Sequence, residues 1–275
     1  MLSLRYYALS AVILLLLTGA ALAGSPNDPP NLTYRSTSSE VRISFFATDS
    51  NNHPVGAPNE GELKRKDFVV VDNGMVIRDF RSLMRSNETA LDIVVMIDAS
   101  ESVSGRFQTT VQDVLQLIAQ DSMASDHNLS VVSFAGLKSA VLCTEDCRSA
   151  NAKEKLLSVT AVGATPLYEA LAYSADFISA RRTAGVRPVL LLFSDGQDTI
   201  SKISVQQAMQ AVISSGALLY AVDTGNQGDN PRASALLQRM AESSGGRYFS
   251  GDENAAGVVQ SALEDLRASY VVSYR

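Results

Sequence analysis

The sequence contains only two histidines and two cysteines, and its 29 acidic residues outnumber its 23 basic ones. Neither His53 nor His127 lies beside a nucleophile at a predicted strand end, so a histidine-based catalytic site is not indicated. Two cysteines are too few for a zinc site, which takes about four ligands. The net charge of −6 at pH 7 argues against binding of nucleic acid, since a nucleic-acid surface is normally basic.

Several motifs of nucleotide-binding and hydrolytic enzymes are also missing. The sequence has no P-loop, no G-x-S-x-G nucleophile elbow, and serines in place of G-x-G-x-x-G after the first strand of its alternating part. That first loop reads D-A-S, whereas phosphatases with an aspartate nucleophile have a second acid two positions after the first. These absences exclude dinucleotide binding on this strand and disfavour catalysis.

The N-terminus has the pattern of a secretory signal. Arg5 precedes the apolar run AVILLLL, and Ala21 and Ala23 form an A-x-A cleavage pattern before Gly24. We therefore expect residues 1–23 to be a signal peptide and the protein to be secreted, or held in the periplasm or cell envelope. The segment YYALSAVILLLLTGAALA is also long enough to remain as an uncleaved anchor. No later segment is predicted to span a membrane.

Export changes the interpretation of the two cysteines. Cys143 and Cys147 lie in the short segment VLCTEDCRS. Because exported proteins fold in an oxidising compartment, we expect a local disulfide between them. A redox-active pair is the lesser alternative, since the C-x-x-C spacing is absent.

The rest of the chain divides into three parts. Residues 24–39 are rich in Pro, Ser and Asn and are predicted to be a linker. Residues 40–85 form a small β-rich segment, with one strand in VRISFFA and a hairpin around Asn73-Gly74. The segment SLMRSNETA is expected to cross to the next domain, which covers residues 91–275.

From residue 91 onward, predicted strands alternate with predicted helices. The runs LDIVVMI and PVLLLF are continuously apolar, as in strands buried on both faces of a parallel sheet. Apolar residues at helical spacing mark helices between the strands. This alternation predicts a doubly wound α/β sheet. We expect strands at 91–97, 129–135, 139–143, 188–193, 217–223, 247–250 and 269–274, and helices near 107–118, 165–180, 205–213, 233–246 and 258–266.

Acidic and hydroxyl residues follow the strands where a doubly wound sheet binds ligands, at its carboxyl edge. Each has a structural explanation of its own: Asp98 and Asp195 suit turns, and Thr165 before Pro166 suits an N-cap with Pro at N1. Together they offer two carboxylates and three hydroxyls, which suits a hard divalent cation that prefers oxygen ligands. The predicted metal ligands are Asp98, Ser100, Ser102, Thr165 and Asp195.

These five positions, in this order, resemble the metal-ion-dependent adhesion site of von Willebrand factor type A domains. The segments GATPLYEAL and LLLFSDGQDT are similar to the usual surroundings of that site's second and third loops. The resemblance implies a Rossmann-like sheet with helices on both faces, and a bound magnesium ion, with manganese or calcium as alternatives. The β-rich segment and the tail LRASYVVSYR resemble secreted A-domain proteins of acidobacteria.

The function that this resemblance implies is binding. In the family, an acidic side chain of a protein partner fills the open coordination position of the metal. Two carboxylates with neutral hydroxyls leave the cation with excess positive charge, which favours a third carboxylate. We therefore expect an exported adhesion-type module that binds an Asp or Glu of a protein partner and is not an enzyme. The alternative is a metal-dependent hydrolase or phosphoryl-transfer enzyme.

Overall fold

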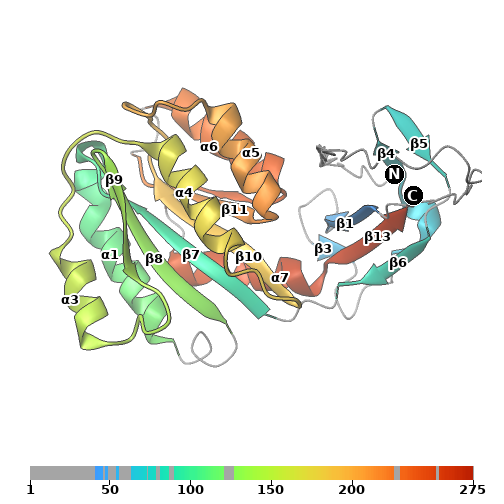
Figure 1. Cartoon of the computed structure of the whole chain (residues 1–275), viewed down its shortest axis with the longest axis horizontal. Coiled ribbons are helices and arrows are strands. Elements are labelled where there is room, and N and C mark those ends of the chain that lie inside the picture. The colour runs from blue at the N-terminus through green and yellow to red at the C-terminus, as the bar shows by residue number, and fades with distance from the viewer. Residues whose placement is uncertain are drawn as a thin grey trace, which may run out of the picture.

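A computed structural model gives the fold of most of the chain (Figure 1). The predicted signal peptide, the predicted linker, His53 and Asn73 lie outside the described residues. Within the described part of the chain, no helix combines the length and apolar character needed to cross a membrane. The structure describes residues 41–45, 47–48, 54–55, 63–72, 74–78, 81–86, 90–120, 127–225, 230–251 and 254–274.

The largest element is a six-stranded sheet with the order β12-β11-β10-β7-β8-β9. Five strands are parallel, and β9 joins β8 as an antiparallel hairpin around Gly136, whose φ is +61°. Every residue of β7 and β10 after the first is buried, which explains their continuous apolar sequences. The strands are β7 (Ala90–Asp98), β8 (Asn128–Ala135), β9 (Lys138–Cys143), β10 (Val186–Ser194), β11 (Leu218–Asp223) and β12 (Tyr248–Phe249).

Helices cover both faces of this sheet, which confirms the predicted fold class. Successive residues of β7 face opposite cores: Ile93 packs with α1, α3 and α7, whereas Val94 packs with α4, α5 and α6. Helix α6 ends at a glycine, since Gly245 is its C-cap with a φ of +85°. The helices are α1 (Ser104–Ala119), α3 (Ala150–Ser158), α4 (Leu167–Ser179), α5 (Val205–Ser215), α6 (Pro231–Ser244) and α7 (Ala255–Arg267).

The ends of the described chain form a separate antiparallel sheet, with the order β1-β13-β6. From the sequence, the last strand was predicted to belong to the α/β domain, and residues 82–85 to a crossing segment. In the structure, β13 (Tyr270–Tyr274) lies between β1 (Val41–Phe45) and β6 (Ser82–Arg85). Figure 1 shows this sheet beyond the end of α7.

Shorter elements complete this β-rich part of the molecule. The predicted hairpin is confirmed as β4 (Val70–Asp72) and β5 (Met75–Ile77), with Gly74 at a φ of +79° in its turn. The remaining elements are β2 (Ala47–Thr48), β3 (Pro54–Val55) and the 3₁₀ turn η1 (Arg65–Asp67). The core of this β-rich part combines residues from before the α/β domain with residues of β13. Its buried members are Leu63, Phe68, Tyr270, Val272 and Tyr274.

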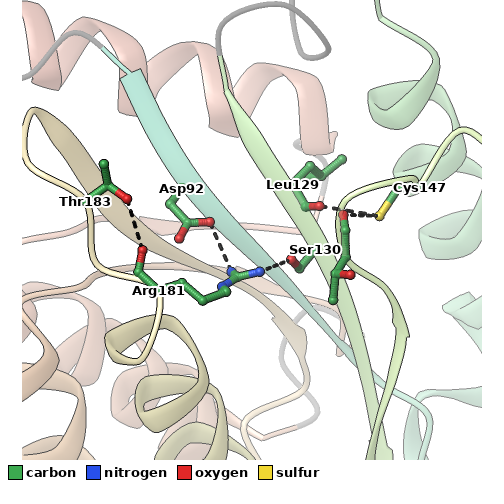
Figure 2. A network of polar contacts seen from close by, with 7 residues as sticks. Asp92, Leu129, Ser130, Cys147, Arg181 and Thr183 are labelled. Carbon is green, nitrogen blue, oxygen red and sulfur yellow. Dashed lines mark hydrogen bonds and ion pairs between the residues drawn. The ribbon is translucent and has the colours of Figure 1, made fainter.

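Two polar features fix the outer parts of the α/β domain. The predicted disulfide between Cys143 and Cys147 is present, and it connects the end of β9 to the segment before α3. At the amino edge of the sheet, the buried Asp92 of β7 accepts a hydrogen bond from the Arg181 guanidinium at 3.0 Å (Figure 2). Arg181 also donates to the Ser130 hydroxyl at 2.6 Å, so one side chain joins the turn after α4 to two neighbouring strands.

Candidate metal centre

Asp98 is the last residue of β7, and its side chain is only 2% exposed. One carboxylate oxygen, Oδ1, accepts a hydrogen bond from the Ser100 backbone amide at 2.9 Å. The other, Oδ2, accepts from the Ser194 hydroxyl at 2.7 Å. The carboxylate is therefore held at the carboxyl edge of the sheet by one neighbouring residue and by the end of β10.

Ser100 and Ser102 lie directly beside this carboxylate. Ser100 is the N-cap of the short 3₁₀ turn η2 (Glu101–Val103), and its hydroxyl oxygen lies 3.2 Å from that of Ser102. The sequence spacing D-x-S-x-S thus places both hydroxyls together, because the turn brings alternate residues to the same side. Ser100 is fully buried, whereas Ser102 is exposed.

Backbone hydrogen bonds join this loop to the one that carries Thr165. The Glu101 amide donates to the Gly163 carbonyl at 3.0 Å, and the Val162 amide donates to the Ala99 carbonyl at 2.8 Å. Gly163 has a φ of +89°, a conformation that side chains rarely adopt. The structure therefore brings the second predicted ligand loop against the first.

Thr165 is 2% exposed and does not have the capping role that the sequence suggested. Helix α4 begins at Leu167, with Pro166 as an N-cap that makes no side-chain hydrogen bond. The Tyr168 amide in the first turn instead donates to the Ser201 hydroxyl at 3.1 Å. The N-cap interpretation was wrong because a distant loop caps this helix, and the Thr165 hydroxyl is not needed for that purpose.

Asp195 follows β10 and is 6% exposed. Its Oδ1 accepts from the Gln197 amide and its Oδ2 from the Gln197 side-chain amide, each at 3.0 Å. Gly196, between Asp195 and Gln197, has a φ of +74°, and a Cβ there would come within 2.7 Å of Leu237. The turn predicted at Asp195-Gly196 is therefore present, and it requires glycine both for its conformation and for its packing.

The electrostatics of the centre are dominated by burial. Burial raises the pKa of Asp98 from 3.8 to about 6, and the hydrogen bonds from Ser100 and Ser194 oppose this shift. The nearby charge of Asp195 raises it further. Among the described residues, neither Asp98 nor Asp195 forms a salt bridge. Two acidic groups thus lie close together, and in the described structure neither is paired with a cationic side chain.

The residues of this centre fit a hard divalent cation. In the described part of the chain, no cluster of three or more His, Cys, Asp and Glu side chains could hold a metal ion, so hydroxyl oxygens would have to contribute. Hydroxyls and carboxylates are the oxygen ligands that magnesium takes, usually with retained waters. Soft or nitrogen ligands, which would favour zinc or copper, are absent from the predicted set.

One residue at the centre was not predicted from the sequence. Ser194 is fully buried at the end of β10, donates to Asp98, and its hydroxyl oxygen accepts from the Gly196 amide at 3.1 Å. It therefore links the first and third predicted ligand loops. The only signal was a serine closing the apolar run LLLF, immediately before Asp195.

Comparisons with known proteins agree with this architecture. A family model described as the von Willebrand factor type A domain matches residues 92–265. No curated protein matches the sequence. The pilus adhesin SpaC from Lactobacillus rhamnosus GG, in an open conformation, is similar in structure with a TM-score of 0.51 and 14% sequence identity. The similarity covers 67% of this chain and 30% of the adhesin, so the chain spans less than a third of that protein.

Two further solved structures are similar to this chain at lower scores. BatB from Bacteroides thetaiotaomicron, a conserved hypothetical protein, has a TM-score of 0.48 and 17% identity over 65% of this chain and 98% of its own. A von Willebrand factor type A structure from Catenulispora acidiphila has a TM-score of 0.44 and 15% identity over 68% of this chain and 48% of its own. The family model matches more than half of the sequence, and the chain therefore belongs to the von Willebrand factor type A domain family.

Proposed function

We propose that this protein is an exported, non-catalytic binding module that captures an acidic side chain of a protein partner through a divalent cation. Magnesium is the proposed ion, with manganese or calcium as alternatives. Membership of the von Willebrand factor type A family supports a protein-interaction role. The cation would be held by Asp98, Ser100, Ser102, Thr165 and Asp195, directly or through water.

The observation that carries this proposal is the pair of buried carboxylates at the carboxyl edge of the sheet. Asp92, at the opposite end of β7, is also buried, but the Arg181 guanidinium neutralises it at 3.0 Å. Asp98 has hydroxyl and amide donors only, and Asp195 lies close enough to disfavour its ionisation further. A buried charge without a counter-ion is strongly unfavourable, and a bound cation would remove that penalty.

The same ligand set explains why a partner carboxylate would bind. Three of the five proposed ligands are neutral hydroxyls, and the two carboxylates formally balance a charge of +2. Both carboxylates also accept hydrogen bonds, which reduces the negative charge that they offer to the cation. A cation held in this way would favour one more anionic ligand at any position that the protein leaves open. Asp and Glu are the protein side chains that supply such a ligand.

The surface beside the centre also suits a protein partner. Leu137, in the turn between β8 and β9, is 88% exposed, and Val162 is 61% exposed. The two segments are in contact, since the Gly136 amide donates to the Ala164 carbonyl at 2.8 Å. Apolar side chains exposed next to a charged site favour contact with a protein surface over contact with water.

An enzymatic role has less support. His127 lies just before β8, where its Nδ1 accepts a hydrogen bond from the Leu91 amide at 3.1 Å. This places it at the amino edge of the sheet, the edge opposite the candidate centre. A hydrolase or phosphoryl-transfer enzyme would need a general base or nucleophile beside the metal. We therefore retain catalysis only as the alternative.

The proposal is tested by comparing Thr165→Val with Thr165→Ser. Both variants should fold, because the Thr165 hydroxyl does not cap α4. Titration calorimetry should show magnesium binding to wild type and to Thr165→Ser, and much weaker binding to Thr165→Val, which lacks a ligand oxygen. At a magnesium concentration of about 100 Kd, the metal should stabilise wild type by about 2.7 kcal/mol. For a domain of this size that corresponds to a Tm rise of about 5–10 °C.

Affinity capture with each variant, with magnesium and with chelator, would then test partner binding. We expect a protein that is retained by wild type and Thr165→Ser only when magnesium is present. Wild type that shows neither heat of binding nor a Tm shift with magnesium would refute the metal centre. Turnover of a phosphorylated or acyl substrate that depends on both metal and the Thr165 hydroxyl would favour the enzymatic alternative.

A further inference from the structure

Two of the five proposed ligands, Ser102 and Asp195, line a pocket at the carboxyl edge of the sheet. The segment that follows β11 forms another part of its wall. No functional role was predicted for that segment from the sequence. Other parts of the wall come from the first turn of α1 and from the start of α6, including Gly105, Arg106, Asn230 and Ser234.

Thr224 is the unusual residue in this wall. It directly follows β11, is 7% exposed, and its amide donates to the Ser194 carbonyl at 3.0 Å. Its hydroxyl oxygen is screened from solvent and makes no hydrogen bond within the described structure. Buried hydroxyls almost always have a partner, and the exceptions often mark functional or ion-binding sites.

Neighbouring acceptors do not account for this hydroxyl. Asp223 lies in the same wall, but its carboxylate already accepts from the Gly225 amide, the Ser234 hydroxyl and the Tyr248 hydroxyl at 2.9, 2.6 and 2.9 Å. Three donors satisfy most of the capacity of that carboxylate. The Thr224 hydroxyl is thus left without a partner among the described residues, and its oxygen can accept a hydrogen bond from a donor in the pocket.

The segment containing Thr224 is also packed directly against a proposed ligand. A Cβ added at Gly225 would lie 3.4 Å from the Asp195 Cβ and 3.1 Å from the Asp223 Oδ1. A side chain at residue 225 would press on the Asp223 carboxylate and contact Asp195, so glycine lets this segment lie closely against both. Thr224 is thus held beside Asp195 by its amide and by the packing of the next residue.

We propose that Thr224 is a further residue of the metal centre, where its hydroxyl oxygen accepts a hydrogen bond from a water of the cation's hydration shell on the β11 side. This inference rests on the proposed function, because it assumes a cation between Asp98 and Asp195. Magnesium keeps several waters when it binds to proteins. A hydroxyl that orients such a water lies outside the ligand set but affects metal affinity, as supporting residues of metal sites usually do.

The test compares Thr224→Val, which removes the hydroxyl at similar volume, with Thr224→Ser, which keeps it. Without metal, Thr224→Val should have a higher Tm than wild type, because it no longer buries an unsatisfied hydroxyl. In magnesium titrations its Kd should rise by about tenfold to a hundredfold. Thr224→Ser should bind magnesium with nearly the wild-type Kd, which separates the role of the hydroxyl from that of packing.

Ser174 supplies a matched control. It is a fully buried residue of α4 whose hydroxyl is also without a hydrogen bond in the described structure. Ser174→Ala removes an equivalent group away from the pocket, so it should leave the magnesium Kd unchanged.

The possible outcomes separate this inference from the proposed function. If wild type binds magnesium and Thr224→Val binds it with the same Kd, the inference is wrong and the proposed centre stands. An equal loss in Thr224→Ser and Thr224→Val would also overturn it, since packing would then be responsible. If wild type binds no magnesium, both the proposed function and this inference fail.

Discussion

Replacing Asp98 by asparagine should stabilise the metal-free protein at neutral pH and abolish its response to magnesium. Asparagine keeps the shape of the side chain and one carbonyl oxygen for the Ser100 amide, but it removes the buried charge. The two effects have opposite signs, and this makes the substitution informative. An ordinary structural aspartate that is satisfied by its hydrogen bonds would show neither of them.

The magnitude follows from the pKa of Asp98, which burial raises from 3.8 to about 6. One pKa unit corresponds to about 1.4 kcal/mol, so the ionised carboxylate costs the folded state about 3 kcal/mol at pH 7.5. A raised pKa means that the folded protein binds the proton more tightly. The stability that protonated Asp98 contributes to the folded state is fully present below pH 3.8 and is lost as the pH rises through about 6.

The assay is thermal unfolding of wild type and Asp98→Asn from pH 4 to pH 7.5, first with chelator and then with magnesium. With chelator, the two proteins should have similar Tm values near pH 4. At pH 7.5 the variant should be more stable by up to about 3 kcal/mol, or about 6–12 °C in Tm. Burial also raises the pKa of Asp92 and of Asp265, and the comparison cancels their effects because both proteins contain them.

Magnesium should reverse the order at pH 7.5, because it stabilises wild type alone by mass action. Protons compete with the cation for Asp98, so the affinity of wild type should fall as the pH drops below about 6. The reasoning would be refuted by a variant that is no more stable than wild type in chelator at pH 7.5. An equal magnesium response in the two proteins would refute the assignment of Asp98 as a ligand.

Two further predictions concern the surroundings of the centre. Leu137→Ser should leave the magnesium Kd and the Tm unchanged, because the side chain is 88% exposed, but it should weaken magnesium-dependent partner capture; unchanged capture would exclude this side chain from the contact surface. Replacing Cys143 and Cys147 together by serine should lower stability by about 2 kcal/mol, since the disulfide closes a short loop, and should leave magnesium binding intact. Alkylation and mass measurement of freshly exported protein should find no free thiol, and two alkylated cysteines would contradict the predicted bond.

Much of the α/β domain could be predicted because its signals are local. The continuous apolar runs of β7 and β10 identified strands buried on both faces, and the stripes of α1 and α5 identified helices that cover them. Parallel strands end at one edge, so the residues after β7 and β10 could be assigned to one site from their sequence positions alone. Whether they bind a metal stays a prediction.

Other elements depend on contacts that no local pattern contains. Helix α3 was not predicted, because it is short and buries only Ala152 and Leu156. Strand β6 was taken for a crossing segment, since its pairing partner is β13, nearly 200 residues later, where the Ser82 and Ser273 hydroxyls lie 2.7 Å apart. A strand at the edge of a small sheet is stabilised chiefly by such pairing.

At the candidate centre too, some features follow from the local sequence and others depend on contacts between distant segments. The sequence by itself determined which acidic and hydroxyl residues follow each strand, because their order and spacing are fixed along the chain. Only the tertiary structure decided that Ser194 donates to Asp98, that Ser201 rather than Thr165 caps α4, and that Thr224 lies buried beside Asp195. Burial and pairing between loops arise when separate strands pack together, so no single stretch of the sequence contains them.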